Sequence, residues 1–316
     1  MKAALVPKYG SLVVQEVDRP EPDAGEVLVR VRATSLNAVN WYGVHGRPLV
    51  ARVLMGLTKP KSSEAGSDFA GVVEAVGAGV EDLAPGDEVF GCQGGAFAEY
   101  VVARDAVERK PAGLTFEEAA AVPVAALAAL QGLRDHGALQ PGQRVLVNGA
   151  SGGVGIYAIQ IANALGATVH AVCSERNVDQ ARSLGAERVF DYGSEDFSRS
   201  GERYDVLFDN AGNRSWRAMR RVLASNATVV VVGGPRKRLF GPLGHVVRIL
   251  LAAKLGSRKA VFFLAKPNRA DLAVLRDLIE AGQVRPVIER RYDFAQIDEA
   301  MRSMDGHARA KIVVTL

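Results

Sequence analysis

Apolar and polar positions follow two different patterns along the chain. Up to about residue 120, short runs rich in β-forming residues, such as 27–31 and 71–76, are separated by Gly, Pro and Asp. Such punctuation is typical of antiparallel strands. Beyond residue 120, apolar strand patterns alternate with segments of helical periodicity, which predicts a parallel sheet with helices on its faces. We therefore expect an α/β protein with a small β-rich domain and a doubly wound parallel-sheet domain.

The change between the two patterns lies at a predicted helix start. Thr115 and Glu118 form a capping box directly before an Ala-rich stretch, and this arrangement marks a helix N-terminus. Near the end of the chain, a helix pattern at 269–280 precedes a final strand at 311–316, which we expect to rejoin the first domain. The predicted segments are a first domain at 1–120, a second domain at 121–265 and a C-terminal return at 266–316.

A strand, turn, helix and second strand follow one another in the second domain. They are predicted at 144–148, 149–155, 156–165 and 168–173, and the turn residues are Ala150, Ser151, Gly152, Gly153, Val154 and Gly155. Glycines let the backbone approach a pyrophosphate closely, and the N–H groups and dipole of the helix start attract its charge. An ordinary tight turn is the alternative, but the context favours dinucleotide binding. Further strands are predicted at 206–209 and 228–232, and further helices at 178–184 and 216–223.

The residues after the second strand of this unit indicate which dinucleotide binds. NAD-binding folds usually carry Asp or Glu there to hydrogen-bond the ribose 2′-OH. This chain has Cys173 or Ser174 at that place, with Arg176 close enough to pair with a 2′-phosphate. Glu175 is counter-evidence, because a shift of one residue would place its carboxylate against the ribose. The pattern favours NADPH as the cofactor.

Composition narrows the class of protein. Hydrophobic residues make up 48% of the chain and charged residues 23%, which is typical of packed domains. The two cysteines, Cys92 and Cys173, exclude a disulfide framework and any four-cysteine metal site. The apolar stretches fall short of the roughly 20 residues that span a bilayer, and no signal peptide pattern opens the chain. We expect a cytoplasmic protein without a transmembrane segment.

Several motifs together carry a resemblance to a known family. They are the stretches 37–42 (NAVNWY), 66–71 (GSDFAG), 85–89 (PGDEV), 94–100 (GGAFAEY) and the turn at 149–155. Over nearly its whole length the chain resembles the zinc-free quinone oxidoreductase branch of the medium-chain dehydrogenase/reductase superfamily. The resemblance implies a GroES-like catalytic domain built from both ends of the chain, a Rossmann domain between them, an active site in the cleft, and a homodimer.

The same resemblance implies roles for individual residues. Ser174, Arg176 and Tyr192 would surround the 2′-phosphate of NADPH, whereas Gly233, Phe263 and Leu264 would lie near the nicotinamide. Tyr192 is equally compatible with a packed aromatic residue. The chain departs from the pattern at Ala128, where relatives often carry a threonine that contacts the cofactor, and Ala150 replaces the first glycine of the fingerprint.

Zinc ligands are missing from the places where the resemblance puts them. Asn37 stands where related alcohol dehydrogenases have a cysteine, and Ser67 stands where they have a histidine. The five histidines have no metal-like spacing: His45, His136, His170, His245 and His307. We expect no metal. Without a Lewis acid, hydride addition to a quinone or an α,β-unsaturated carbonyl is favoured, because the charge spreads over a conjugated system. Tyr42 and Asn37 are the candidate catalytic hydrogen-bonding residues.

Positive charge gathers late in the second domain. Residues 210–270 contain no Asp or Glu, and Arg and Lys punctuate an apolar segment at 236–259. This segment could cover the substrate cleft or a subunit interface, which we favour, or contact an anionic membrane surface. No nucleic-acid-binding module accompanies the charge. Two alternatives to the reductase remain: a zinc-free alcohol or aldehyde oxidoreductase, and a nucleotide-binding redox sensor with little turnover.

Overall fold

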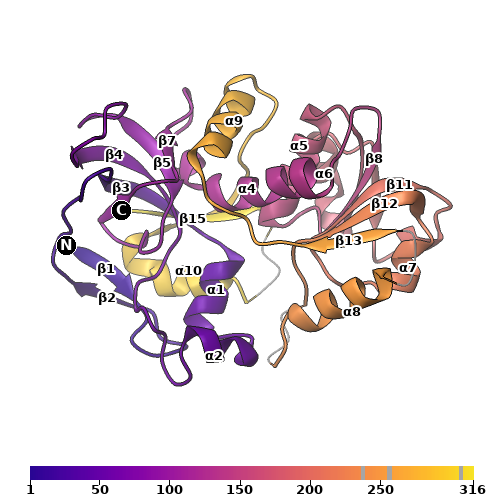
Figure 1. Ribbon diagram of the computed structural model, residues 1–316, viewed down its shortest axis with the longest axis horizontal. Coiled ribbons are helices and arrows are strands. Elements are labelled where there is room, and N and C mark those ends of the chain that lie inside the picture. The colour runs from indigo at the N-terminus through magenta and orange to yellow at the C-terminus, as the bar shows by residue number, and fades with distance from the viewer. Residues whose placement is uncertain (236–238, 255–257, 306–308) are drawn as a thin grey trace. The chain divides into compact units, whose positions relative to one another are not determined.

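The computed structural model describes residues 1–235, 239–254, 258–305 and 309–316. The chain forms two compact units (Figure 1). The first consists of Met1–Leu127, Lys266–Gly282 and Pro286–Leu316, and the second of Ala128–Ala265 and Gln283–Arg285. The predicted fold class is confirmed, because one unit holds a mostly antiparallel sheet and the other a wholly parallel sheet.

The first unit is built on a seven-stranded sheet in the order β14-β15-β3-β4-β5-β7, with β6 also paired to β3. Its strands are β3 (Val27–Leu36), β4 (Asp68–Val76), β5 (Glu88–Cys92), β6 (Tyr100–Ala103), β7 (Val107–Arg109), β14 (Ile288–Asp293) and β15 (Lys311–Thr315), and β1 (Lys2–Leu5) pairs separately with β2 (Val13–Glu16). The last strand, β15, pairs antiparallel with β3. The two ends of the chain therefore share one sheet.

Short helices cover this unit. They are α1 (Ala38–His45), η1 (Leu49–Ala51), α2 (Arg52–Met55), α3 (Phe116–Ala120), α9 (Arg269–Glu280), η5 (Phe294–Gln296) and α10 (Ile297–Ser303), while α4 (Pro123–Gln131) contains residues of both units. The capping box predicted at Thr115 is confirmed. The side-chain oxygen of Thr115 accepts from the N–H of Glu118 at 3.2 Å, and the N–H of Thr115 donates back to the Glu118 carboxylate at 2.9 Å.

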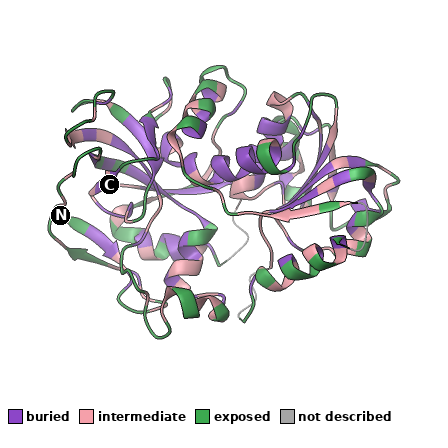
Figure 2. Ribbon diagram, viewed as in Figure 1, coloured by how far each residue is buried: buried purple, intermediate pink, exposed green. Residues whose placement is uncertain are grey.

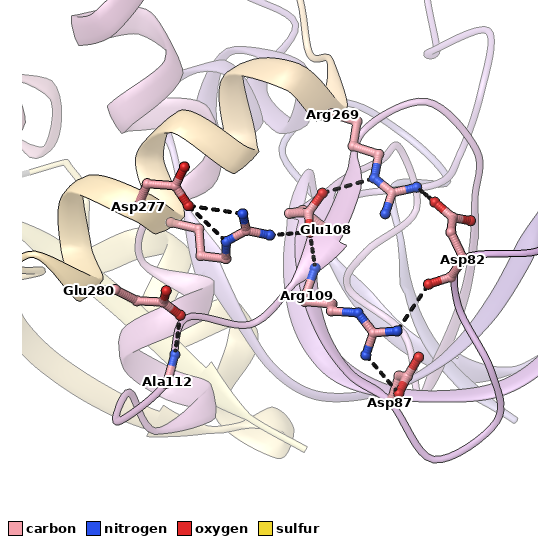
Figure 3. A network of polar contacts seen from close by, with 9 residues as sticks. Asp82, Asp87, Glu108, Arg109, Ala112, Arg269, Asp277 and Glu280 are labelled. Carbon is pink, nitrogen blue, oxygen red and sulfur yellow. Dashed lines mark hydrogen bonds and ion pairs between the residues drawn. The ribbon is translucent and has the colours of Figure 1, made fainter.

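An ionic network ties helix α9 to strand β7 within the first unit (Figure 3). The carboxylate of Glu108, which is buried, accepts hydrogen bonds from Arg269 at 2.8 Å and from Arg276 at 2.7 Å. Glu280 accepts from the backbone N–H of Ala112 at 2.9 Å. Because a buried carboxylate needs such partners, the network fixes the returning C-terminal segment on the N-terminal strands.

The second unit is a parallel six-stranded sheet in the order β10-β9-β8-β11-β12-β13. The strands are β8 (Arg144–Asn148), β9 (Thr168–Cys173), β10 (Arg188–Asp191), β11 (Tyr204–Asp209), β12 (Leu223–Val231) and β13 (Lys259–Phe262). The helical segments are η2 (Gly132–His136), α5 (Gly153–Ala164), η3 (Glu175–Asn177), α6 (Val178–Ser183), η4 (Phe197–Arg199), α7 (Trp216–Arg220) and α8 (Leu243–Ala253). The predicted strands at 144–148 and 168–173 are confirmed.

The helix predicted at 216–223 is too long. Helix α7 ends at Arg220, and Leu223 already begins strand β12, where it pairs with Tyr204. Val222 and Leu223 are both buried in the core of this unit. Their apolar character continues the helical pattern, but Leu223 pairs in the sheet and Val222 packs in the core just before the strand.

Burial separates central strands from edge strands (Figure 2). Strand β8 is almost entirely buried, whereas β13, at the edge of the same sheet, has exposed and half-buried residues only. None of the helices in the described part of the chain has both the length and the apolar character needed to cross a membrane.

Candidate functional site

The predicted cofactor residues collect at one edge of the parallel sheet. In a parallel sheet all carboxyl ends of the strands lie at the same edge, where ligands of doubly wound folds bind. The residues that follow these ends are the 149–155 turn after β8, Ser174 after β9, Tyr192 after β10, Gly233 after β12 and Phe263 after β13. The fold therefore brings segments from five strands to one edge of the second unit.

The turn after β8 depends on its glycines. Gly149 has a φ of 87°, a backbone conformation that favours glycine. A Cβ atom at Gly155 would lie 2.2 Å from the carbonyl oxygen of Gly149, so only glycine lets α5 start this close to the strand. A Cβ at Gly152, the N-cap of α5, would have no neighbour nearer than 3.5 Å. The backbone at Gly152 is thus more open to a phosphate than the backbone at Gly149 or Gly155.

Ser174, Arg176 and Tyr192 lie at the ends of two paired strands. Strand β9 ends at Cys173, so Ser174 is the first residue after it and Glu175 already belongs to η3. The N–H of Tyr192 donates to the carbonyl oxygen of Cys173 at 3.1 Å, which holds the two strand ends side by side. The contact of these residues with a 2′-phosphate stays a prediction.

An acidic side chain that the sequence analysis did not consider lies at the same edge. The carboxylate of Asp191 accepts from the N–H of Gly193 at 3.0 Å and from the hydroxyl of Ser194 at 2.9 Å. These hydrogen bonds hold the pKa of Asp191 below its usual value. A negative charge therefore stands at the edge where the 2′-phosphate is predicted to bind, and this charge by itself disfavours a phosphate there.

A buried polar cluster lies at the end of β11, where the sequence analysis named no site residue. The carboxylate of Asp209 accepts from Nδ2 of Asn148 at 2.8 Å and from the N–H of Gly212 at 3.0 Å, and it lies 2.9 Å from Nε2 of His245. His245 belongs to α8, so the cluster fixes this helix at the carboxyl edge. The signal was an acidic residue at the end of an otherwise apolar predicted strand.

The residues predicted near the nicotinamide have distinct surroundings. A Cβ on Gly233 would lie 2.4 Å from the carbonyl oxygen of Asn210, so this position requires glycine. The ring of Phe263 stacks on that of His136 with centroids 4.3 Å apart. Leu264 is 76% exposed, and Tyr192, at the same edge, is 50% exposed. Exposed apolar side chains at this edge suit the flat rings of a dinucleotide.

A second constellation lies within the first unit, around Asn37. Its Nδ2 donates to Oδ2 of Asp68 at 2.6 Å and lies 3.2 Å from the hydroxyl oxygen of Ser67. Its Oδ1 accepts from Nζ of Lys311 at 2.5 Å. Both amide hydrogens and the carbonyl oxygen of Asn37 are therefore engaged by the protein itself. This position orients its neighbours, and a direct bond from Asn37 to a substrate stays a prediction.

Lys311 and Asp68 are the residues of this constellation that the sequence analysis missed. Both are fully buried, at 1% and 0% exposure, and Nζ of Lys311 lies 3.4 Å from Oδ2 of Asp68. Burial lowers the pKa of Lys311, and the neighbouring Asp68 acts in the opposite direction. The other oxygen of Asp68 accepts from the N–H of Val124 at 3.0 Å, and Ser35 donates to Oδ2 at 2.8 Å.

A pocket of about 250 Å³ in the first unit opens over this constellation. It is lined by Ser67, Cys92, Gln93, Gly94, Asp105, Ala106, Val124 and Pro267. Two members of the constellation line it: Ser67, which bonds Asn37, and Val124, whose N–H donates to Asp68. Burial and the nearby Asp68 raise the pKa of the Cys92 thiol, so the thiol is protonated at neutral pH and unreactive.

Tyr42 lies on helix α1, whose N-cap is Asn37, and is half-buried. Its ring packs edge-on against Trp41, with centroids 5.4 Å apart, and contacts the core that both ends of the chain build. This packing explains why an aromatic residue is present. It does not test the catalytic role of the hydroxyl, which stays a prediction.

Comparison with known proteins places these features in a family. Residues 23–112 match the alcohol dehydrogenase GroES-like domain, and residues 184–314 match the zinc-binding dehydrogenase family. The chloroplastic quinone-oxidoreductase QR1 of Triphysaria versicolor is 32% identical, and the alignment covers 95% of this chain and 92% of that protein. The chain belongs to the quinone oxidoreductase branch of the zinc-type alcohol dehydrogenase-like superfamily.

Two further relatives extend the comparison. The 2-methylene-furan-3-one reductase of Solanum lycopersicum is 30% identical over 99% of this chain and 79% of that protein. The solved structure of the quinone oxidoreductase from Coxiella burnetii matches with a TM-score of 0.87 at 29% identity, covering 100% of this chain and 99% of that chain. The chain is thus an oxidoreductase of a family that depends on nicotinamide dinucleotides, with a GroES-like and a Rossmann-like part.

The residues of this superfamily member do not fit a zinc ion. Zinc prefers thiolate, imidazole and carboxylate ligands, whereas an amide and a hydroxyl stand here at Asn37 and Ser67. The ammonium group of Lys311 is 2.5 Å from Oδ1 of Asn37, so a positive charge already occupies the place next to this oxygen. Among the described residues, which exclude His307, no three His, Cys, Asp or Glu side chains form a metal-binding group.

Proposed function

We propose that this oxidoreductase transfers hydride from NADPH to quinones or α,β-unsaturated carbonyl compounds without zinc. The observation that carries the proposal is the hydrogen-bonded group of Asn37, Ser67, Asp68 and Lys311. It fills the region of the missing zinc ligands with a fixed network of its own. A conjugated acceptor suits such a site, because the negative charge that develops on its oxygen is delocalised.

The cofactor fits the carboxyl edge of the parallel sheet. The open backbone at Gly152 would face the pyrophosphate, and Ser174, Arg176 and Tyr192 would surround the 2′-phosphate. Gly233, Phe263 and Leu264 would lie near the nicotinamide. When bound, NADPH supplies the hydride.

Ser67 is our candidate for contacting the oxygen of the acceptor. Its Oγ lies 3.2 Å from the amide nitrogens of both Asn37 and Asn40. The hydroxyl of Ser67 also has Oδ1 of Asn40 as an acceptor at 3.3 Å. When a substrate oxygen enters the 250 Å³ pocket, the hydroxyl would turn from Asn40 to donate to it, while Nδ2 of Asn37 donates to Oγ of Ser67. Lys311 holds the amide of Asn37 in the orientation that this requires. The hydroxyl of Tyr42 is our candidate for proton donation to the reduced product.

Mixing the protein anaerobically with NADPH and separate quinones, enones and aldehydes tests this function. Oxidation of NADPH by quinones or enones is the expected result. Reduction of simple aldehydes alone would instead establish a zinc-free alcohol or aldehyde oxidoreductase. Tight NADPH binding with no turnover on any acceptor would leave a nucleotide-binding redox sensor.

We also propose that the chain works as a homodimer in the cytoplasm. The family resemblance supports the dimer, and the two buried, unpaired thiols suit a reducing compartment. Sedimentation at micromolar concentration tests the dimer, since a monomer at all concentrations would reject it.

A further inference from the structure

An arginine-rich pocket lies in the second unit, away from the residues assigned to the cofactor. Its volume is about 510 Å³. The lining residues are Ser198, Arg199, Gly201, Arg203, Arg217, Arg220, Arg221 and Arg258. Six of these eight residues are arginines, and four of the six come from the stretch 210–270 that contains no acidic residue.

The topology of the parallel sheet explains why these arginines meet. Arg203 and Arg258 directly precede β11 and β13, and Arg221 stands two residues before β12. The three strands are neighbours and parallel, so their starts lie at one edge. Helix α7, which carries Arg217 and Arg220, lies at that side in Figure 1. The cofactor residues follow the opposite ends of the strands, about 20 Å away for a six-residue strand.

Backbone carbonyl groups hold two of the arginines in place. Arg258 donates to the carbonyl oxygens of Ala224 at 3.1 Å and Leu223 at 3.2 Å. Nη1 of Arg203 donates to the carbonyl oxygen of Arg221 at 2.8 Å. A carbonyl oxygen carries no net charge. These bonds therefore orient the guanidinium groups but leave their positive charges uncompensated.

Carboxylates do not neutralise the pocket either. Within the described parts of the chain, Arg199 is the one lining arginine with an ion pair, to Asp196 at the long distance of 4.0 Å. The nearby Glu202 is already paired with Arg144 at 2.8 Å and Arg188 at 2.9 Å. The six like charges repel one another, and a bound anion would relieve this repulsion.

We propose that this pocket binds a small anion with two or more phosphate groups. The planar guanidinium fork matches phosphate oxygens in pairs, and several forks from separate segments suit a ligand with more than one phosphate. The lining contains no aromatic side chain, so it lacks the stacking surface that single-stranded nucleic acids require. Recognition is directed at the phosphates rather than at a base.

Calorimetric titration of the full chain with inorganic pyrophosphate tests the proposal. We expect one pyrophosphate per chain, with the same affinity in the absence and the presence of saturating NADPH, and weaker binding of orthophosphate. Replacing Arg217 and Arg220 together by Gln should weaken pyrophosphate binding at least about tenfold, the usual effect of losing one charge-assisted contact. The control R182Q, an exposed arginine on α6 of the same unit, should bind as the unsubstituted protein does.

Four results would overturn the site. These are the absence of pyrophosphate binding, unchanged binding in the R217Q/R220Q variant, loss of binding when NADPH is present, and equal affinity for orthophosphate. NADPH competition would place the anion at the glycine turn. Circular dichroism of the double variant checks the fold, and an R203Q variant provides a second test at another segment of the pocket. Tighter binding of a single-stranded RNA oligomer than of pyrophosphate would also reject the small-anion proposal.

Discussion

Replacing Lys311 by Met removes one charge from the buried pair with Asp68 while keeping most of the side-chain volume. Lys311 is 1% exposed, Asp68 is 0% exposed, and the ammonium lies 2.5 Å from Oδ1 of Asn37. The substitution leaves the carboxylate of Asp68 without its buried counter-charge and Oδ1 of Asn37 without its donor. Breaking a buried pair in this way costs about 3–5 kcal/mol. We expect the free energy of unfolding of the first unit to fall by about this amount.

The two tryptophans allow this loss to be measured in one unit. Trp41 lies in the first unit and Trp216 in the second. In a Trp216→Phe background, urea unfolding followed by fluorescence reports on the first unit alone. The matched control is Lys8→Met, because Lys8 is an exposed lysine of the same unit, and it should change the stability little. A loss below about 1 kcal/mol for Lys311→Met, the range of exposed ion pairs, would refute the reasoning.

Four further predictions concern the cofactor, the chemistry, the metal and pH. Arg176→Ala should weaken NADPH binding about tenfold to a hundredfold and leave NADH binding unchanged; equal affinities of the unsubstituted protein for both cofactors would contradict this. Tyr42→Phe should lower turnover by about 10²–10⁴-fold with NADPH binding retained, and full activity would reject the role of the hydroxyl. Elemental analysis should find no stoichiometric zinc, and activity should survive prolonged chelation; one zinc per chain that leaves together with activity would restore a zinc mechanism. Burial lowers the pKa of Lys311 in the folded state, so the unfolded chain binds more protons than the folded chain between that pKa and 10.5. The free energy of unfolding should therefore rise as the pH increases through this window. The same dependence of stability on alkaline pH in Lys311→Met would refute this.

The central strands and the turn between them follow from sequence alone. Strands β8 and β9 have a hydrogen-bonded neighbour on each side and bury nearly every residue. Such strands are continuous apolar runs, which are easily recognised. The glycines after β8 mark the turn in the same way, because the positive φ of Gly149 and the close approach at Gly155 are local requirements. Local chemistry thus determined the position of the proposed cofactor site.

The strands at the sheet edges and the end of α7 could not be predicted in the same way. Strands β10, β13 and β14, which the sequence analysis missed, each lie at the edge of a sheet and bury one residue or none. Their sequences therefore lack a strong apolar pattern. Helix α7 stops at Arg220 because Leu223 has a pairing partner in β11, which no local propensity reveals.

Only the tertiary structure decided which polar side chains meet. Lys311 is 274 residues from Asn37 in sequence, yet pairing of Ile312 with Leu36 between β15 and β3 brings the two side chains together. The arginines of the 510 Å³ pocket likewise meet because three parallel strands start at one edge. Sequence patterns report the burial and backbone preferences of neighbouring residues. Contacts between distant polar side chains depend instead on strand order and register, which are properties of the whole chain.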